Sequence, residues 1–89
     1  MQRIKELKRE TSETKVELKI NLDGVGKSEV ETGIKFFDHL LSTLSFYSLF
    51  DLRIHASGDL RHHLIEDVGI ALGKSFNEAN SKSLGIKRF

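Results

Sequence analysis

The sequence predicts a single α+β domain over residues 1–89: a two-layer sandwich with the order β-β-β-α-β-α and both helices on one face of the sheet. Three observations predict this class. One stretch alternates in hydrophobicity with a period of two, two longer stretches carry apolar residues at helical spacing, and glycine-containing or polar segments separate them. A chain of 89 residues without cysteine has only a small core, so self-association or a bound metal would add stability.

The clearest strand begins at Thr14, where every second residue is apolar: Val16, Leu18, Ile20 and Leu22. Residues 23–26 (DGVG) have turn composition, and residues 27–32 are expected to return beside the first strand as a hairpin. Another strand is expected over residues 51–56. Residues 2–8 are open to two interpretations, an edge strand or a frayed helix.

Two helices are expected from apolar residues that recur every three or four positions, over residues 36–47 and 62–80. Residues 81–85 are expected to end the second helix. Gly69 and Gly73 lie inside it and weaken it by about 1 kcal/mol each relative to alanine. They would also permit another helix or a ligand to approach closely.

The composition excludes several classes of function. Fourteen basic residues against thirteen acidic ones, with no basic block, argue against nucleic-acid binding. The polar residues 1–10 do not resemble a secretory signal, and no apolar run approaches the roughly 20 residues of a membrane span. A cytoplasmic protein without a membrane partner is expected. Lys5, Lys8 and Arg9 are interpreted as solvated surface charges.

The run HHLIED carries the strongest chemical signal. His62 and Glu66 are four residues apart, and His63 and Glu66 three, so each pair shares a helix face. Imidazole and carboxylate suit divalent transition ions, and His39 offers a third imidazole at the start of the other helix. Adjacent histidines at a helix start are also common as exposed polar residues near a cap, so both interpretations stay open. His55 alternates away from the apolar face of its strand and is expected on the surface.

The stretches RETSETKV, TGIKFFDHLL, HHLIEDVGIALG and GIKRF, in this order, resemble imidazoleglycerol-phosphate dehydratase from about residue 9 to residue 89. The resemblance implies a manganese-dependent enzyme of histidine biosynthesis, which removes water from imidazole glycerol phosphate. It also implies a family chain of two similar halves, whose helices pack together between outer sheets, and a symmetric assembly with active sites between subunits.

The resemblance further implies a role for each matching residue. Glu13 falls near the reacting carbon, as the candidate catalytic base. Arg88 falls at the substrate phosphate, and Asp67 is a carboxylate that orients an imidazole. Asp38 either serves similarly or caps its helix. The implied metal ligands are His39, His62, His63 and Glu66.

Two departures from the family pattern shape the functional hypotheses. The resemblance covers one half of the family's length, and GDLRHH stands where first halves read GDLxxDDHH. The first hypothesis is a dehydratase half-unit that forms its sites by homo-oligomerisation through the helix layer. The alternative is a catalytically weak or inactive oligomeric module that represents the ancestral half. An engineered or ancestral-type half, a natural half-length protein and a piece of a longer chain all fit the sequence.

Overall fold

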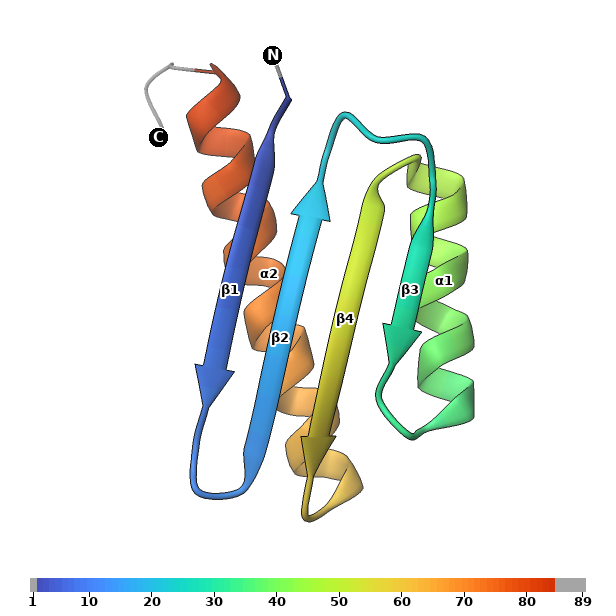
Figure 1. Ribbon diagram of the computed structural model, residues 1–89, viewed down its shortest axis with the longest axis vertical. Coiled ribbons are helices and arrows are strands. Elements are labelled where there is room, and N and C mark those ends of the chain that lie inside the picture. Colours follow the sequence, from blue (N-terminus) through green and yellow to red (C-terminus); the bar gives the residue numbers. More distant parts are fainter. Residues whose placement is uncertain (1, 85–89) are drawn as a thin grey trace.

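The described part of the chain forms a four-stranded sheet with two helices on one face, as predicted (Figure 1). The computed structural model describes residues 2–84, with side chains through residue 81. The strand order across the sheet is β1-β2-β4-β3. The elements along the chain are β1 (Ile4–Glu10), β2 (Thr14–Asn21), β3 (Ser28–Glu31), α1 (Lys35–Ser48), β4 (Asp51–Gly58) and α2 (Arg61–Leu84).

The core lies between the sheet and α2. The predicted alternation along β2 is confirmed, because Val16, Leu18 and Ile20 are buried while the residues between them are exposed. The two central strands and α2 enclose this core, and burial of its apolar surface stabilises the fold. Its buried members from β4 and α2 are Leu52, Ile54, Leu64, Val68, Ala71 and Ala79.

The predicted hairpin between β2 and β3 is wrong. β4 lies between these two strands: it pairs antiparallel with β2 over its whole length and parallel with β3. The segment β3-α1-β4 is therefore a βαβ unit whose crossover is α1. The strand that follows β2 in the sequence does not pair with it.

Asp51 explains why residues 23–26 do not close a hairpin. Its carboxylate accepts hydrogen bonds of 2.9 Å from the backbone N–H groups of Val25 and Lys27. These bonds hold the pKa of Asp51 below its ordinary value. A Cβ on Gly24 would lie 2.3 Å from the Asp51 Cγ, and Gly26 has a φ of 87°, so both positions favour glycine. The glycines serve a loop that wraps around the start of β4.

The hairpin in the structure joins β1 to β2. Of the two interpretations of residues 2–8, the edge strand is therefore correct. The Thr11 Oγ1 accepts hydrogen bonds from the N–H groups of Glu13 and Thr14 and so closes the turn. Lys5 in β1 lies 3.3 Å from the Glu78 carboxylate of α2. Lys5 is therefore a partly exposed surface charge that pairs with Glu78.

The two helices pack differently. α2 runs behind β1, β2 and β4, whereas α1 covers the β3 edge (Figure 1). α2 begins one residue before the predicted start and continues to Leu84, past its predicted end. Neither described helix combines the length and the apolar character that crossing a bilayer requires.

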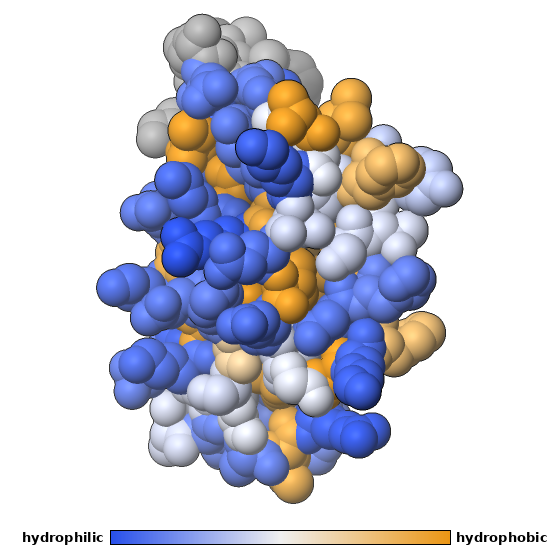
Figure 2. All heavy atoms as spheres, turned by 45° about the vertical axis from the view of Figure 1, so that its right-hand side comes forward, coloured by the Kyte–Doolittle hydropathy of each residue, from blue (hydrophilic) through white to orange (hydrophobic). Residues whose placement is uncertain are grey.

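An apolar groove of about 370 Å³ separates the helices, with a lining that includes Leu44, Phe50, Leu72 and Phe76. Gly69 and Gly73 also line it, and a Cβ on either would meet no atom within 4 Å. On α1, exposed apolar side chains recur at helical spacing: Phe36, Leu40, Leu44 and Tyr47. Hydrophilic side chains dominate the strand face in Figure 2, while hydrophobic ones protrude on the α1 side.

Candidate functional site

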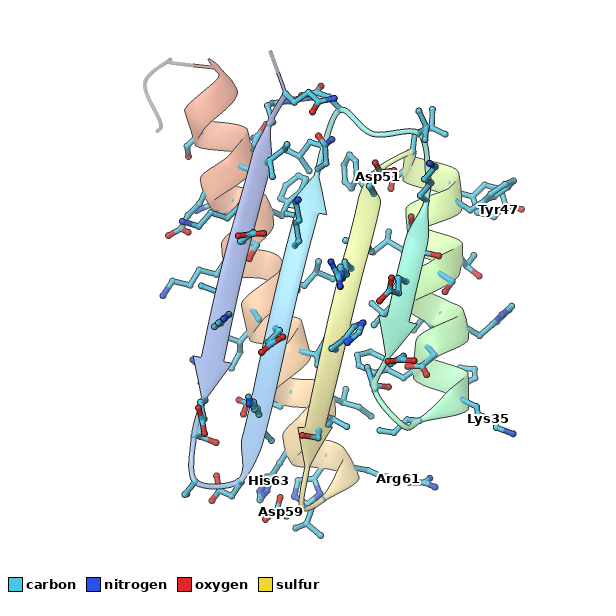
Figure 3. The ribbon with its side chains drawn as sticks, in the orientation of Figure 1. Lys35, Tyr47, Asp51, Asp59, Arg61 and His63 are labelled. Carbon is cyan, nitrogen blue, oxygen red and sulfur yellow. The ribbon has the colours of Figure 1, made fainter. Side chains whose placement is uncertain are left out.

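The first turn of α2 lies beside the turn between β1 and β2, at the end of the molecule where α1 also begins (Figure 3). The N–H of Asp59 donates to the carbonyl of Glu13 at 3.0 Å. A Cβ on Gly58 would lie 2.8 Å from the Thr14 Cγ2, so glycine permits the close approach of these two segments. The end of β4 thereby fixes the turn that carries Glu13 against the start of α2.

His63 is surrounded by carboxylates. Its Nδ1 lies 3.2 Å from the Asp59 Oδ1, and its ring centroid is 4.4 Å from that of His62. The pKa of His63 is raised chiefly by the hydrogen bond to Asp59, which partial burial opposes. The negative charges of Glu13 and Glu66 raise it further. The fold thus gathers Glu13, His62, His63 and Glu66 at one end of the molecule, which the HHLIED spacing alone could not predict for Glu13.

Asp67 forms a polar tie between α2 and the β1–β2 hairpin. Its carboxylate accepts a hydrogen bond from the hydroxyl of Thr14 and another, at 3.3 Å, from the Nε of Arg9. The hydrogen bond from Thr14 is the main reason that the pKa of Asp67 is lowered. Arg9 is thus a partly exposed surface charge that pairs with a mostly buried carboxylate. The predicted role of Asp67 in orienting an imidazole stays a prediction.

His39 lies on α1, exposed to solvent, whereas the other three predicted metal ligands lie on α2. Its neighbour Asp38 accepts hydrogen bonds from the N–H and the hydroxyl of Thr32, and so fastens the loop that leads into α1. Within residues 2–84, no three histidine or carboxylate side chains are arranged to hold a metal ion together. Arg88 lies outside the described residues.

A polar cleft of about 670 Å³ opens next to this cluster. It runs between the end of β4 and the loop before α1, and its lining includes Asp59 together with the cations Lys15 and Arg61. In Figure 3, Arg61 extends from the start of α2 at the same end as Asp59 and His63. Glu17 and Glu31 line the same cleft, so it presents charges of both signs.

His55 lies on the outer face of the sheet, as predicted. Its ring contacts the carboxylates of Glu29 and Glu31 on the neighbouring β3. It also lines the polar cleft beside the start of α2. Because its ring pairs with these carboxylates and it is not one of the predicted metal ligands, His55 offers a histidine control for experiments on the cluster at the start of α2.

Sequence reasoning missed Asp59, Arg9 and Thr14. The signal for Asp59 was present, because an aspartate four residues before a histidine can reach it across one helical turn. No local pattern pointed to Arg9 and Thr14. They meet Asp67 only because the hairpin folds onto α2.

The fold and this cluster define a two-layer α+β domain with imidazoles and carboxylates at the start of its second helix. Comparison with known proteins agrees: residues 32–89 match the family described as imidazoleglycerol-phosphate dehydratase. The chain belongs to this family.

Relatives named imidazoleglycerol-phosphate dehydratase match almost the whole chain. The one from Lactococcus lactis is 52% identical over 95 residues, which cover 100% of this chain and 48% of that protein. The one from Methanosarcina mazei is 52% identical, covering 98% and 47%. The one from Methanopyrus kandleri is 51% identical, covering 97% and 44%. The chain spans about half the length of the curated relatives it matches.

Proposed function

We propose that this chain is a half-unit of imidazoleglycerol-phosphate dehydratase. It acts in cytoplasmic histidine biosynthesis as a homo-oligomer that removes water from imidazole glycerol phosphate with manganese. The single observation that carries the proposal is the match to this family across the chain, with the family-type residues Glu13, His62, His63 and Glu66 gathered at one end of the fold. The proposal extends the activity named for longer relatives to a chain of about half their length.

The donor chemistry of the cluster fits manganese. His62 and Glu66 are exposed one turn apart on α2, and His63 is half-buried beside them. Imidazole nitrogen and carboxylate oxygen together are ligands that divalent transition ions accept. His62, His63, Glu66 and His39 would hold the ion, which supplies Lewis-acid stabilisation of negative charge on the substrate.

The chain's own groups bind and orient the substrate and accept a proton. Glu13 is exposed on a turn whose backbone is fixed by Thr11 and Asp59, so its carboxylate can act as a general base on the C–H beside the imidazole. Arg88 is proposed to bind the phosphate.

A second copy of the chain is the proposed partner. The apolar groove between the helices and the stripe of Phe36, Leu40, Leu44 and Tyr47 lie on the helix side of the sheet, where a copy related by a two-fold axis would cover both. A larger assembly of such pairs, formed through a second interface, is proposed to bring His39 of one copy towards the α2 cluster of another.

The first experiment combines mass and activity on one sample. Light scattering with and without manganese, followed by a dehydratase assay, is expected to show a defined oligomer with turnover. A stable oligomer that binds manganese without turnover would support the alternative, an inactive module representing the ancestral half. A monomer that is indifferent to manganese and inactive would contradict the proposal.

The ligand assignment is tested by calorimetry with manganese. Replacing both His62 and His63 with alanine is expected to abolish tight binding, because it removes two of the proposed ligands. His55→Ala is the matched control, since it removes a histidine on the outer face of the sheet. Unchanged manganese affinity in the double variant would disprove the assignment.

The interface is tested on α1 and α2. Leu72→Asp would separate the copies, but Leu72 also packs against the core. Leu44→Asp is the cleaner variant because Leu44 lines the groove and is exposed, and Phe46→Asp on the same helix is its control. Sedimentation is expected to show dissociation for Leu44→Asp alone, and an unchanged profile would count against this interface.

A further inference from the structure

The short connection between β4 and α2 places Asp59 four residues before His63. The Asp59 Oδ1 lies 3.2 Å from the His63 Nδ1 and also accepts the N–H of Leu60 at 2.6 Å. The aspartate after the glycine stands four residues before the second histidine in GDLRHH and seven residues before it in the longer GDLxxDDHH pattern. The contact is therefore a consequence of the GDLRHH spacing in this chain.

Asp59 is anchored on its backbone as well as on its side chain. Its N–H donates to the Glu13 carbonyl at 3.0 Å, which ties it to the turn that carries Glu13. The ordinary pKa of aspartate is about 3.9, so the carboxylate of Asp59 is ionised at neutral pH. An ionised carboxylate accepts hydrogen bonds and donates none.

The acceptor at Nδ1 decides which nitrogen of His63 is free. A neutral imidazole carries one proton, and facing an ionised carboxylate the proton stays on Nδ1. The lone pair is then on Nε2. Asp67, the carboxylate that the family resemblance implied for this role, is held instead by Thr14 and Arg9, one on each oxygen.

We propose that Asp59 is a positioning residue that fixes His63 in the Nδ1–H tautomer and so presents Nε2 to a metal ion. The part that concerns the metal rests on the proposed function. The tautomer itself is a property of the metal-free protein and does not depend on the proposed function. Carboxylates that hold the outer nitrogen of a ligating histidine orient the ring and raise its basicity. In this chain Asp59 supplies that support through its place one turn before the ligand.

The tautomer is read directly from imidazole ¹⁵N chemical shifts of metal-free protein at about pH 9, where an ordinary histidine is neutral. The wild type is expected to show His63 with its proton on Nδ1. Asp59→Asn is expected to move the proton population towards Nε2, with His55 and His62 unchanged. Glu13→Gln is the matched control, because it removes a nearby negative charge without removing a hydrogen bond to the ring.

A wild-type His63 protonated on Nε2, or an Asp59→Asn variant with an unchanged tautomer, would overturn the proposal. Circular dichroism of each variant establishes that the fold is retained. If Asp59→Asn does not fold, Asp59→Glu tests the same point, since a carboxylate that still reaches Nδ1 must restore the Nδ1–H tautomer.

Calorimetry with manganese separates the two proposals. Asp59→Asn is expected to weaken manganese binding about 10–100-fold, the usual effect of losing such a supporting carboxylate. Equal affinity in wild type and variant would overturn the positioning role. If the wild type binds no manganese, the proposed function fails, while the ¹⁵N shifts still decide whether Asp59 sets the tautomer.

Discussion

The two helices of this domain have opposite relations to the sheet. α2 presents a continuous buried face of small and apolar residues, including Val68, Ala71 and Ala79, to three strands. α1 buries only Leu41 and Ser45 fully and leaves aromatic residues such as Tyr47, which is 79% exposed, in solvent. The difference indicates that α2 stabilises the single chain, whereas much of the apolar surface of α1 is free for a partner.

The largest effect is expected at the contact between α2 and the sheet. Val68→Asp places a charge at a fully buried position, where no partner can pair with it, and is expected to prevent folding. Ile70→Asp, two residues later on the exposed side, is expected to leave the fold intact. Circular dichroism and one-dimensional NMR measure both, and a folded Val68→Asp would contradict the assignment of this face to the core.

A second variant pair compares neighbouring leucines on α1. Leu41 is 5% exposed and Leu40 is 51% exposed. Leu41→Ala is expected to lower the free energy of unfolding by about 2–5 kcal/mol because it leaves a cavity, and Leu40→Ala by less than about 0.5 kcal/mol in the monomer. Urea denaturation at low protein concentration measures the difference. Equal losses would mean that α1 does not pack as described.

Gly69 and Gly73 allow the proposed interface to be tested on α2, because both line the groove between the helices. Since a new Cβ at Gly69 or Gly73 meets no atom within 4 Å, Gly→Ala at either position is expected to stabilise the isolated chain by about 1 kcal/mol. The added methyl groups would occupy the groove proposed for a second copy, so self-association is expected to weaken. Thermal unfolding and sedimentation together measure the two effects, and tighter association in the alanine variants would argue against the groove as interface.

The smallest effect concerns pH and the pair of Asp59 and His63. The raised pKa of His63 means that its charged form stabilises the fold at pH below its unfolded value of about 6.5, and that this contribution is lost as pH rises through the folded pKa. The pKa of Asp59 is lowered in the folded protein, so its ionised form stabilises the fold above its unfolded value of about 3.9. This contribution is lost when the pH falls below about 4 and the carboxylate is protonated.

The difference in stability between wild type and Asp59→Asn is therefore expected to be largest near about pH 5–6 and smaller at about pH 8. Urea denaturation at a series of pH values measures it. A difference that grew with pH would contradict the assigned direction of the His63 shift.

The existence of the helices and the buried face of β2 could be predicted from the sequence because they depend on local periodicity, whereas many apolar residues of the helices are exposed. The alternation after Thr14 identified the buried side of β2, and the helical spacing after Phe36 identified α1. Strand pairing could not be predicted in the same way. Residues 23–26 have hairpin composition, but their donors bind Asp51, which lies more than twenty residues later in the sequence.

In the candidate site too, local spacing predicted some features, and others depend on contacts between distant segments. The spacing within HHLIED correctly placed His62, His63 and Glu66 at the start of a helix. The approach of Glu13 to His63 and the hydrogen bonds of Asp67 with Arg9 and Thr14 depend on the hairpin folding onto α2. No pattern within either segment records that contact.

The place of β4 between β2 and β3 has a consequence for the order of folding. Residues 1–50 can close the local β1–β2 hairpin, but the described partners of β3 and of the inner edge of β2 both wait for β4. Segments distant in sequence pair slowly, because the chain loses conformational entropy when the loop closes, before the stabilising contacts have formed. Pulse-labelled hydrogen exchange should find amides of β3 and β4 protected together, after those of the hairpin, so that the sheet assembles in one late cooperative event.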